Sequence, residues 1–89
     1  MLNSETIIWA AILSGTGTIY CGSRHPTIRA AILEKEKTLA GSRAGFLTSS
    51  GRFVNREEAA RLASDAGQRH MHTGRPIDPN CELRSEDLW

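Results

Sequence analysis

Short apolar runs separated by turn residues divide the chain into alternating strand and helix segments. Residues 5–13 and 18–21 are rich in β-branched and aromatic side chains, which favours strands, and the Ser-Gly-Thr-Gly between them is typical of a turn. A Gly-x-Gly in this turn lacks the helix and the Lys-Ser/Thr pair that follow a phosphate-binding loop. Residues 5–22 are therefore predicted to form a β-hairpin.

The next segment has helical periodicity. Ile28, Ala31 and Ile32 share one face, and Pro26 suits the first turn of a helix. The predicted helix covers residues 26–39 and ends before a Gly-Ser pair.

The run of residues 45–63 is the most informative part of the sequence. Two short apolar segments flank a Ser-Ser-Gly turn, which predicts a second hairpin. Asn55 is a strong helix N-cap residue, and Glu58 follows three positions later, as in a capping box. The predicted helix covers residues 56–66, and Gly67 supplies its C-terminal stop.

The predicted order is β-β-α-β-β-α-tail, with a Pro-containing extended segment after Gly74. This order predicts an α+β fold, in which two helices pack on one side of a small antiparallel sheet built from hairpins. The 89 residues form one predicted domain, 1–89. A chain of this length buries a modest core, and two cysteines do not make a disulfide framework, so oligomerisation is the expected source of added stability.

The charge of the chain changes the functional picture. A formal net charge of +1 argues against a protein that coats DNA or RNA. Nine of the eleven basic residues are Arg; residues 43–75 have a net charge of +3 and residues 76–89 a net charge of −3. Arg is suited to bidentate contacts with phosphate and to stacking on bases.

Targeting signals are not evident in the sequence. The apolar run at residues 7–13 is too short to span a bilayer, and it lacks the flanking features of a signal peptide. We expect a reduced, cytoplasmic protein that does not bind membranes.

The start of the second helix is the best candidate for a binding site. Arg52, Asn55 and Arg56 flank this helix N-terminus, where free backbone N–H groups and the helix dipole favour an anion. Phe46 and Phe53 could stack on a base, and the alternative that both belong to the core stays open.

Catalytic and metal sites are less well supported. Cys21 and His25 could act as a thiol nucleophile and its base, but no third, orienting residue is identifiable. His70 and His72 could face one side of an extended chain, but a third metal ligand is not obvious. We therefore expect neither an enzyme nor a cofactor.

Four segments together resemble a known family, the first-described type of phage anti-defence protein that inhibits Thoeris immunity. They are Tyr20-Cys21-Gly22-Ser23-Arg24-His25, Gly45-Phe46-Leu47-Thr48 through Arg52-Phe53-Val54-Asn55-Arg56-Glu57-Glu58-Ala59, Ala66-Gly67-Gln68 and Ser85-Glu86-Asp87-Leu88-Trp89. The resemblance covers the chain from about residue 18 to its end.

The resemblance implies a non-catalytic sponge. Such proteins bind cyclic ADP-ribose isomers made by TIR-domain enzymes in the host cytoplasm and hold them uncleaved, and some members also bind cyclic oligonucleotides of CBASS defence. It implies a homo-oligomer, a dimer or a dimer-based hexamer, with a pocket made by more than one protomer. The implied ligand contacts are Arg24, His25, Phe46, Arg52, Asn55, Arg75 and Arg84.

Two alternatives remain open from the sequence. One is a small hydrolase that degrades the signal with His25 and Cys21. The other is an inhibitor that docks on an immune protein through Leu88, Trp89 and the acidic tail.

Overall fold

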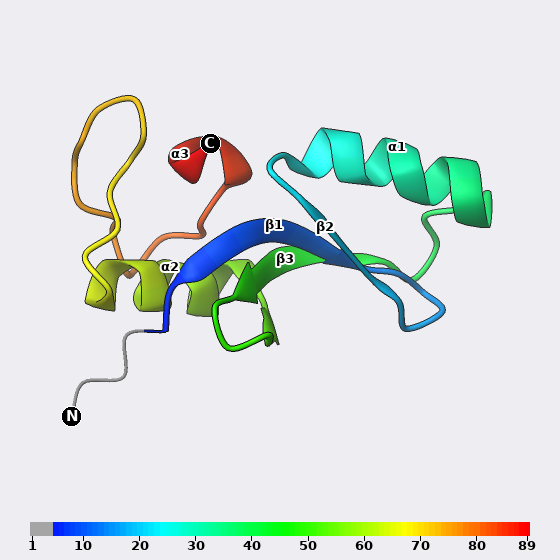
Figure 1. Ribbon diagram of the computed structural model, residues 1–89, viewed down its shortest axis with the longest axis horizontal. Helices are drawn as coiled ribbons and strands as arrows, with labels where there is room; N and C mark the ends of the chain where they lie inside the picture. The colour runs from blue at the N-terminus through cyan, green and yellow to red at the C-terminus, as the bar shows by residue number, and fades with distance from the viewer. Residues whose placement is uncertain (1–4) are drawn as a thin grey trace.

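Two β-hairpins and two main helices alternate along the chain, as the sequence predicts. The computed structural model describes residues 5–89, so the first four residues of the predicted domain lie outside it. The elements in chain order are β1 (Ile7–Leu13), β2 (Ile19–Gly22), α1 (His25–Glu36), β3 (Arg43–Thr48), β4 (Phe53–Val54), α2 (Arg56–Asp65) and α3 (Ser85–Leu88). The α+β prediction is confirmed (Figure 1).

All strand pairs of the sheet are antiparallel, in the order β2-β1-β3-β4. The register places Gly22, Ala10, Phe46 and Val54 in one row across the four strands. Ala10 and Phe46 are fully buried and Val54 is nearly so, because side chains paired across strands point to the same face. This row forms the centre of the core.

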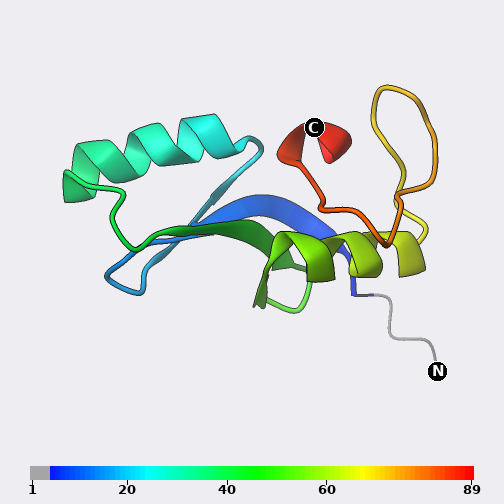
Figure 2. The same ribbon diagram turned by 180° about the vertical axis from the view of Figure 1, so that it is seen from behind.

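The helices cover the core face of the sheet. Ile28 and Ile32 of α1 are buried against it, and α2 contributes three fully buried alanines, Ala59, Ala60 and Ala63. Because alanine is small, the axis of α2 lies close to the sheet. Figures 1 and 2 show α1 and α3 above the same side of the sheet.

The opposite face of the sheet is apolar and largely uncovered. By strand alternation it carries Leu13 and Ile19, which pair with each other, and Leu47 and Phe53, which also pair. Within residues 5–89 the core cluster includes none of these four, and Ile19 is 43% exposed.

The ends of α2 match the sequence prediction. The Asn55 Oδ1 accepts the backbone N–H of Glu58 at 2.7 Å. At the other end Gly67 has φ +75, and the N–H of Gln68 bonds to the carbonyl of Ala63 at 2.9 Å, a Schellman pattern. The Glu58 carboxylate pairs with Arg52, so it contributes to a site instead of completing a capping box.

Two boundaries differ from the prediction. Helix α1 ends at Glu36, three residues early, because Lys37 adopts the left-handed conformation (φ 67) and its N–H bonds to the carbonyl of Leu33. The predicted tail contains the short helix α3. The Asp87 carboxylate accepts the N–H of Arg84 at 2.9 Å and so fixes the first turn of α3.

Gly45, in the middle of β3, is a strand position where a side chain has no room. A Cβ there would collide with the carbonyl oxygen of Val54 and lie 2.6 Å from Cζ of Phe53. Gly22 provides a contrast in the same sheet, since a Cβ there would meet only the flexible side chain of Ile28, with Cγ1 at 3.4 Å and Cδ1 at 3.8 Å.

We expect Gly45→Ala to lower the free energy of unfolding by about 3 kcal/mol, the upper end of the overpacking range, because a backbone carbonyl cannot yield as a flexible side chain does. Gly22→Ala is the matched control and should change it by less than about 1 kcal/mol. Urea denaturation measures both. Equal losses in the two variants would contradict the close packing of Phe53 over Gly45.

Candidate functional site

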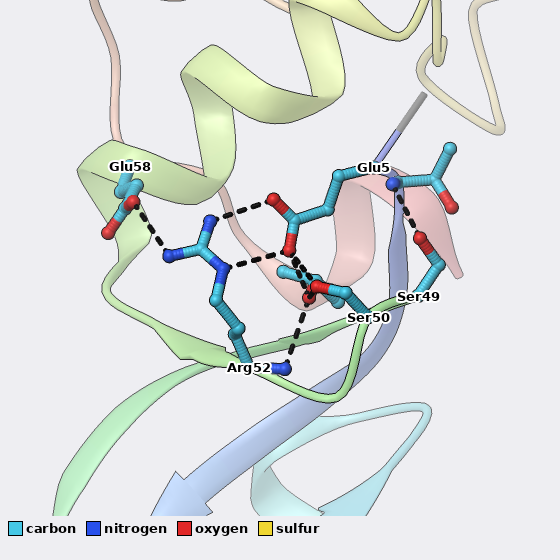
Figure 3. Close-up of polar contacts among 7 residues, drawn as sticks. Glu5, Ser49, Ser50, Arg52 and Glu58 are labelled. Carbon is cyan, nitrogen blue, oxygen red and sulfur yellow. Dashed lines mark hydrogen bonds and ion pairs between the residues drawn. The ribbon is translucent and has the colours of Figure 1, made fainter. Parts of the chain in front are cut away.

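Arg52 lies between two carboxylates beside the start of α2 (Figure 3). Its Nε and Nη2 donate to the two oxygens of Glu5, at 2.9 and 2.7 Å. Its Nη1 lies 3.5 Å from the Glu58 carboxylate. The bidentate contact joins the segment before β1 to the β3–β4 turn, and the ion pair with Glu58 joins this turn to α2.

Hydroxyl groups of the β3–β4 turn complete this cluster. Thr48 donates to Glu5 Oε2 at 2.6 Å, and Ser50 donates to the same oxygen. Hydrogen bonds from Arg52, then from Ser50 and Thr48, lower the pKa of Glu5 from 4.5 to about 2, and the Glu5 carboxylate raises the pKa of Arg52. Arg52, predicted as a phosphate contact, is therefore already paired, and a phosphate would have to displace Glu5.

This cluster makes stability depend on pH. Because the folded-state pKa of Glu5 is lowered, its contribution to stability is present above pH 4.5 and is lost as the pH falls toward about 2. We expect the urea midpoint of the wild type to fall across this range more steeply than that of Glu5→Gln.

Glu82→Gln is the control for that measurement, because Glu82 is exposed, lies outside the helices and forms no ion pair within residues 5–89. It should keep the wild-type pH profile. If Glu5→Gln also keeps that profile, the ion pair with Arg52 does not contribute in solution.

A cleft lies between the start of α2 and the C-terminal segment. Its volume is about 500 Å³, and the residues that line it are Arg56, Cys81, Glu82, Arg84, Glu86 and Asp87. The N–H of Leu83 bonds to the carbonyl of Arg56 at 3.0 Å and holds the C-terminal segment beside α2. The Nε of Arg56 is buried and has no hydrogen-bond partner within residues 5–89, so this donor is unsatisfied.

Two predicted site arginines meet at one carboxylate of this cleft. Glu86 lies 4.0 Å from Arg24 and 3.8 Å from Arg84. The Arg84 side chain is 71% exposed, and that of Arg24 is 45% exposed. Both pairs are long and solvent-accessible, so they hold the arginines loosely.

His25 and Phe46, the next two predicted contacts, are buried beneath α3. The ring of His25 meets that of Phe46 edge-on, with centroids 5.1 Å apart, and its Nε2 bonds to the carbonyl of Gly45 at 2.8 Å. Burial lowers the pKa of His25. Neither ring is open to a ligand in this arrangement, so a direct contact would require α3 or Trp89 to move.

The remaining predicted contacts lie apart. Asn55 uses its side-chain oxygen to cap α2. Arg75 is exposed in the loop that projects beyond α2 (Figure 1), where its carbonyl accepts the N–H of His70. The structure thus gathers Arg24, His25, Phe46 and Arg84 around α3, keeps Arg52 and Asn55 near the start of α2, and leaves Arg75 outside both groups.

Sequence reasoning did not identify Glu5 or Trp9. Glu5 binds a residue 47 positions away, and Trp9 stacks against Trp89 with centroids 6.5 Å apart. No local pattern signals either contact.

The structure also shows the surroundings of the residues considered for catalysis, Cys21 and His25, and of His70, considered for metal binding. Cys21 is exposed on β2, whereas the ring of its proposed base, His25, is buried. His70 lies 3.5 Å from Asp87, and residues 5–89 contain no group of three metal-ligating side chains. In the same part of the chain, no helix has the length and apolar character needed to cross a membrane.

Comparison with known proteins identifies one family. The model of a family described as "Phage T4 y16D protein" matches residues 6–89. No curated protein and no solved structure matches the chain.

Proposed function

The chain belongs to the phage T4 y16D protein family, and from this premise we propose that it is an immune-evasion protein that binds and sequesters a cyclic nucleotide signal. The ligand class is a cyclic ADP-ribose isomer of Thoeris defence, with cyclic oligonucleotides of CBASS defence as further candidates. This ligand class is what the resemblance to the Thoeris inhibitors implies. Those inhibitors are phage proteins, and the family of this chain is also a phage family.

The cleft beside α2 is the observation that carries the proposal. Its volume of about 500 Å³ falls within the range of small-molecule sites. Arg56 and Arg84 offer guanidinium groups to a phosphate, and Arg56 brings a buried donor that has no partner among residues 5–89. The carboxylates of Glu82, Glu86 and Asp87 can accept hydrogen bonds from ribose hydroxyls and base amino groups.

Sequestration without cleavage is the proposed mode of action. The imidazole Nε2 of His25 is engaged by a backbone carbonyl, so it is not free to activate a nucleophile in this arrangement. The thiol that lines the cleft, Cys81, donates to the Asp78 carboxylate at 3.2 Å, and this contact raises the pKa of the thiol and so disfavours the nucleophilic thiolate.

The proposed assembly is a homo-oligomer, a dimer or a dimer-based hexamer, that acts in the host cytoplasm where the signal is made. The uncovered apolar face of the sheet supports this proposal. On this face Ile19 is 43% exposed and Leu13, Leu47 and Phe53 are half-buried, and burial of such side chains against a second copy would add to the stability of a small core.

The test is a titration of the purified protein with cyclic ADP-ribose isomers and cyclic di- and trinucleotides. A ligand that binds the folded state raises the melting temperature, and denaturation should return the ligand unchanged. Stoichiometric protein should also prevent the signal from activating its effector. Absence of both effects across the panel would refute sequestration.

Arg84→Ala should raise the Kd for the bound signal about tenfold, because a charge-assisted hydrogen bond to phosphate is lost. Arg61→Ala is the matched control, since Arg61 lies exposed on α2 and does not line the cleft. Calorimetric titration measures both values, and equal affinities would remove Arg84 from the site.

Two other outcomes of the titration would favour the alternatives. Recovery of a new product would favour a hydrolase, and a stable complex with an immune protein in the absence of nucleotide would favour a protein-binding inhibitor. For the inhibitor, Leu88 and Trp89 are poor docking anchors in this arrangement, because both pack against the protein's own core.

A further inference from the structure

Trp89 links two aromatic rings that lie on neighbouring strands. Its ring is nearly parallel to that of Trp9, with centroids 6.5 Å apart and an interplanar angle of 17°. It is also nearly parallel to the ring of Phe46, at 6.4 Å and 22°. Trp9 is 44% exposed and Phe46 is fully buried, so Trp89 stacks on one ring at the surface and on one ring in the core.

The segment that carries Trp89 is anchored on one side, where the N–H of Met71 bonds to the carbonyl of Asp87 at 2.8 Å and Leu88 packs on the core, and its contacts with α1 are weaker. Helix α3 has four residues, and its bonds to α1 are long: the N–H of His25 to Ser85 Oγ, and Arg24 Nη1 to the carbonyl of Trp89, both at 3.3 Å. Arg24 therefore binds the backbone of the residue whose ring stacks on Phe46. Trp89 therefore engages both the guanidinium of Arg24 and the ring of Phe46.

We propose that Trp9 and Phe46 form a binding slot for a planar heteroaromatic ring, a nucleobase, and that Trp89 occupies this slot when no ligand is present. The ligand class is a purine nucleotide, and the inference rests on the proposed function for that class. When the base enters, Trp89 leaves the slot while α3 keeps its place beside the cleft, and Arg24 exchanges the Trp89 carbonyl for a phosphate of the ligand.

Each contact that Trp89 gives up in the exchange is replaced by a contact with the ligand. An indole and a purine are both flat and aromatic, so one stacked ring replaces another, and base–aromatic stacking is favourable for every base. Arg24 loses a neutral acceptor and Glu86, which lies at 4.0 Å, and it gains a charged acceptor. Competition from Trp89 lowers the apparent affinity by the fraction of molecules in which the slot is open.

The chain contains two tryptophans, which makes the slot directly observable. In Trp89→Ala the remaining tryptophan is Trp9, whose fluorescence reports on a ring stacked against it. We expect ADP-ribose and AMP to quench this fluorescence, with a Kd about tenfold lower than that of the wild type by calorimetry. Adding Trp9→Ala to this variant should weaken binding about fivefold or more.

Leu88→Ala is the matched control, because Leu88 packs against the core from the same helix and is outside the ring stack. It should loosen the tail without the tenfold gain in affinity. Trp89→Leu keeps apolar bulk at this position and serves as the test variant if Trp89→Ala fails to fold. It should show the same tenfold gain in affinity over the wild type.

Binding by Trp89→Ala and Trp89→Leu that is no tighter than binding by Leu88→Ala would overturn the slot, as would an unquenched Trp9. If the wild type sequesters a cyclic signal while Trp9 fluorescence in Trp89→Ala is unchanged, the slot is wrong and the proposed function stands. If Trp89→Ala binds AMP through Trp9 while no cyclic nucleotide is sequestered, the slot stands and the proposed function fails.

Discussion

The burial of Phe46 is the interaction on which the rest of the structure depends. Phe46 lies in the row that crosses all four strands, and its ring also meets His25 at the start of α1 and Trp89 at the end of the tail. The sheet, the first helix and the C-terminal segment therefore share one contact centre. With only two phenylalanines in 89 residues, the core has few side chains large enough for this role.

The placement of the candidate cleft follows from small residues. Three fully buried alanines bring α2 close to the sheet, and the Asn55 cap fixes where the helix begins. Arg56 is consequently held at the first turn, with its carbonyl bonded to Leu83 of the returning chain. The cleft forms because the C-terminal segment returns to the start of α2. The position of the cleft therefore depends both on Arg56 and on the path of residues 81–87.

Local features were predictable and long-range ones were not. The two hairpins, the Asn55 cap and the Gly67 stop depend on residues a few positions apart, and their signals lie in the sequence itself. The Glu5–Arg52 pair joins residues 47 positions apart, and the Trp9–Trp89 stack joins opposite ends of the chain. Such contacts follow only from the packed topology, so the sequence could not predict the ion pair of Arg52, and for Phe46 it left a place in the core open beside a ligand contact.

Carboxylates of the protein face Arg24, Arg52 and Arg84, three of the four arginines predicted to contact a ligand. The acidic tail supplies Glu86, which faces both Arg24 and Arg84, while Glu5 and Glu58 face Arg52. An anionic ligand therefore competes with internal carboxylates for these three arginines, and the competition differs among them. Glu5 holds Arg52 through a bidentate contact at 2.7 Å, whereas Glu86 is 55% exposed and lies 3.8 Å or more from each partner. Because weak, solvated pairs exchange partners at little loss of free energy, an anion would displace Glu86 from Arg24 and Arg84 more readily than it would displace Glu5 from Arg52.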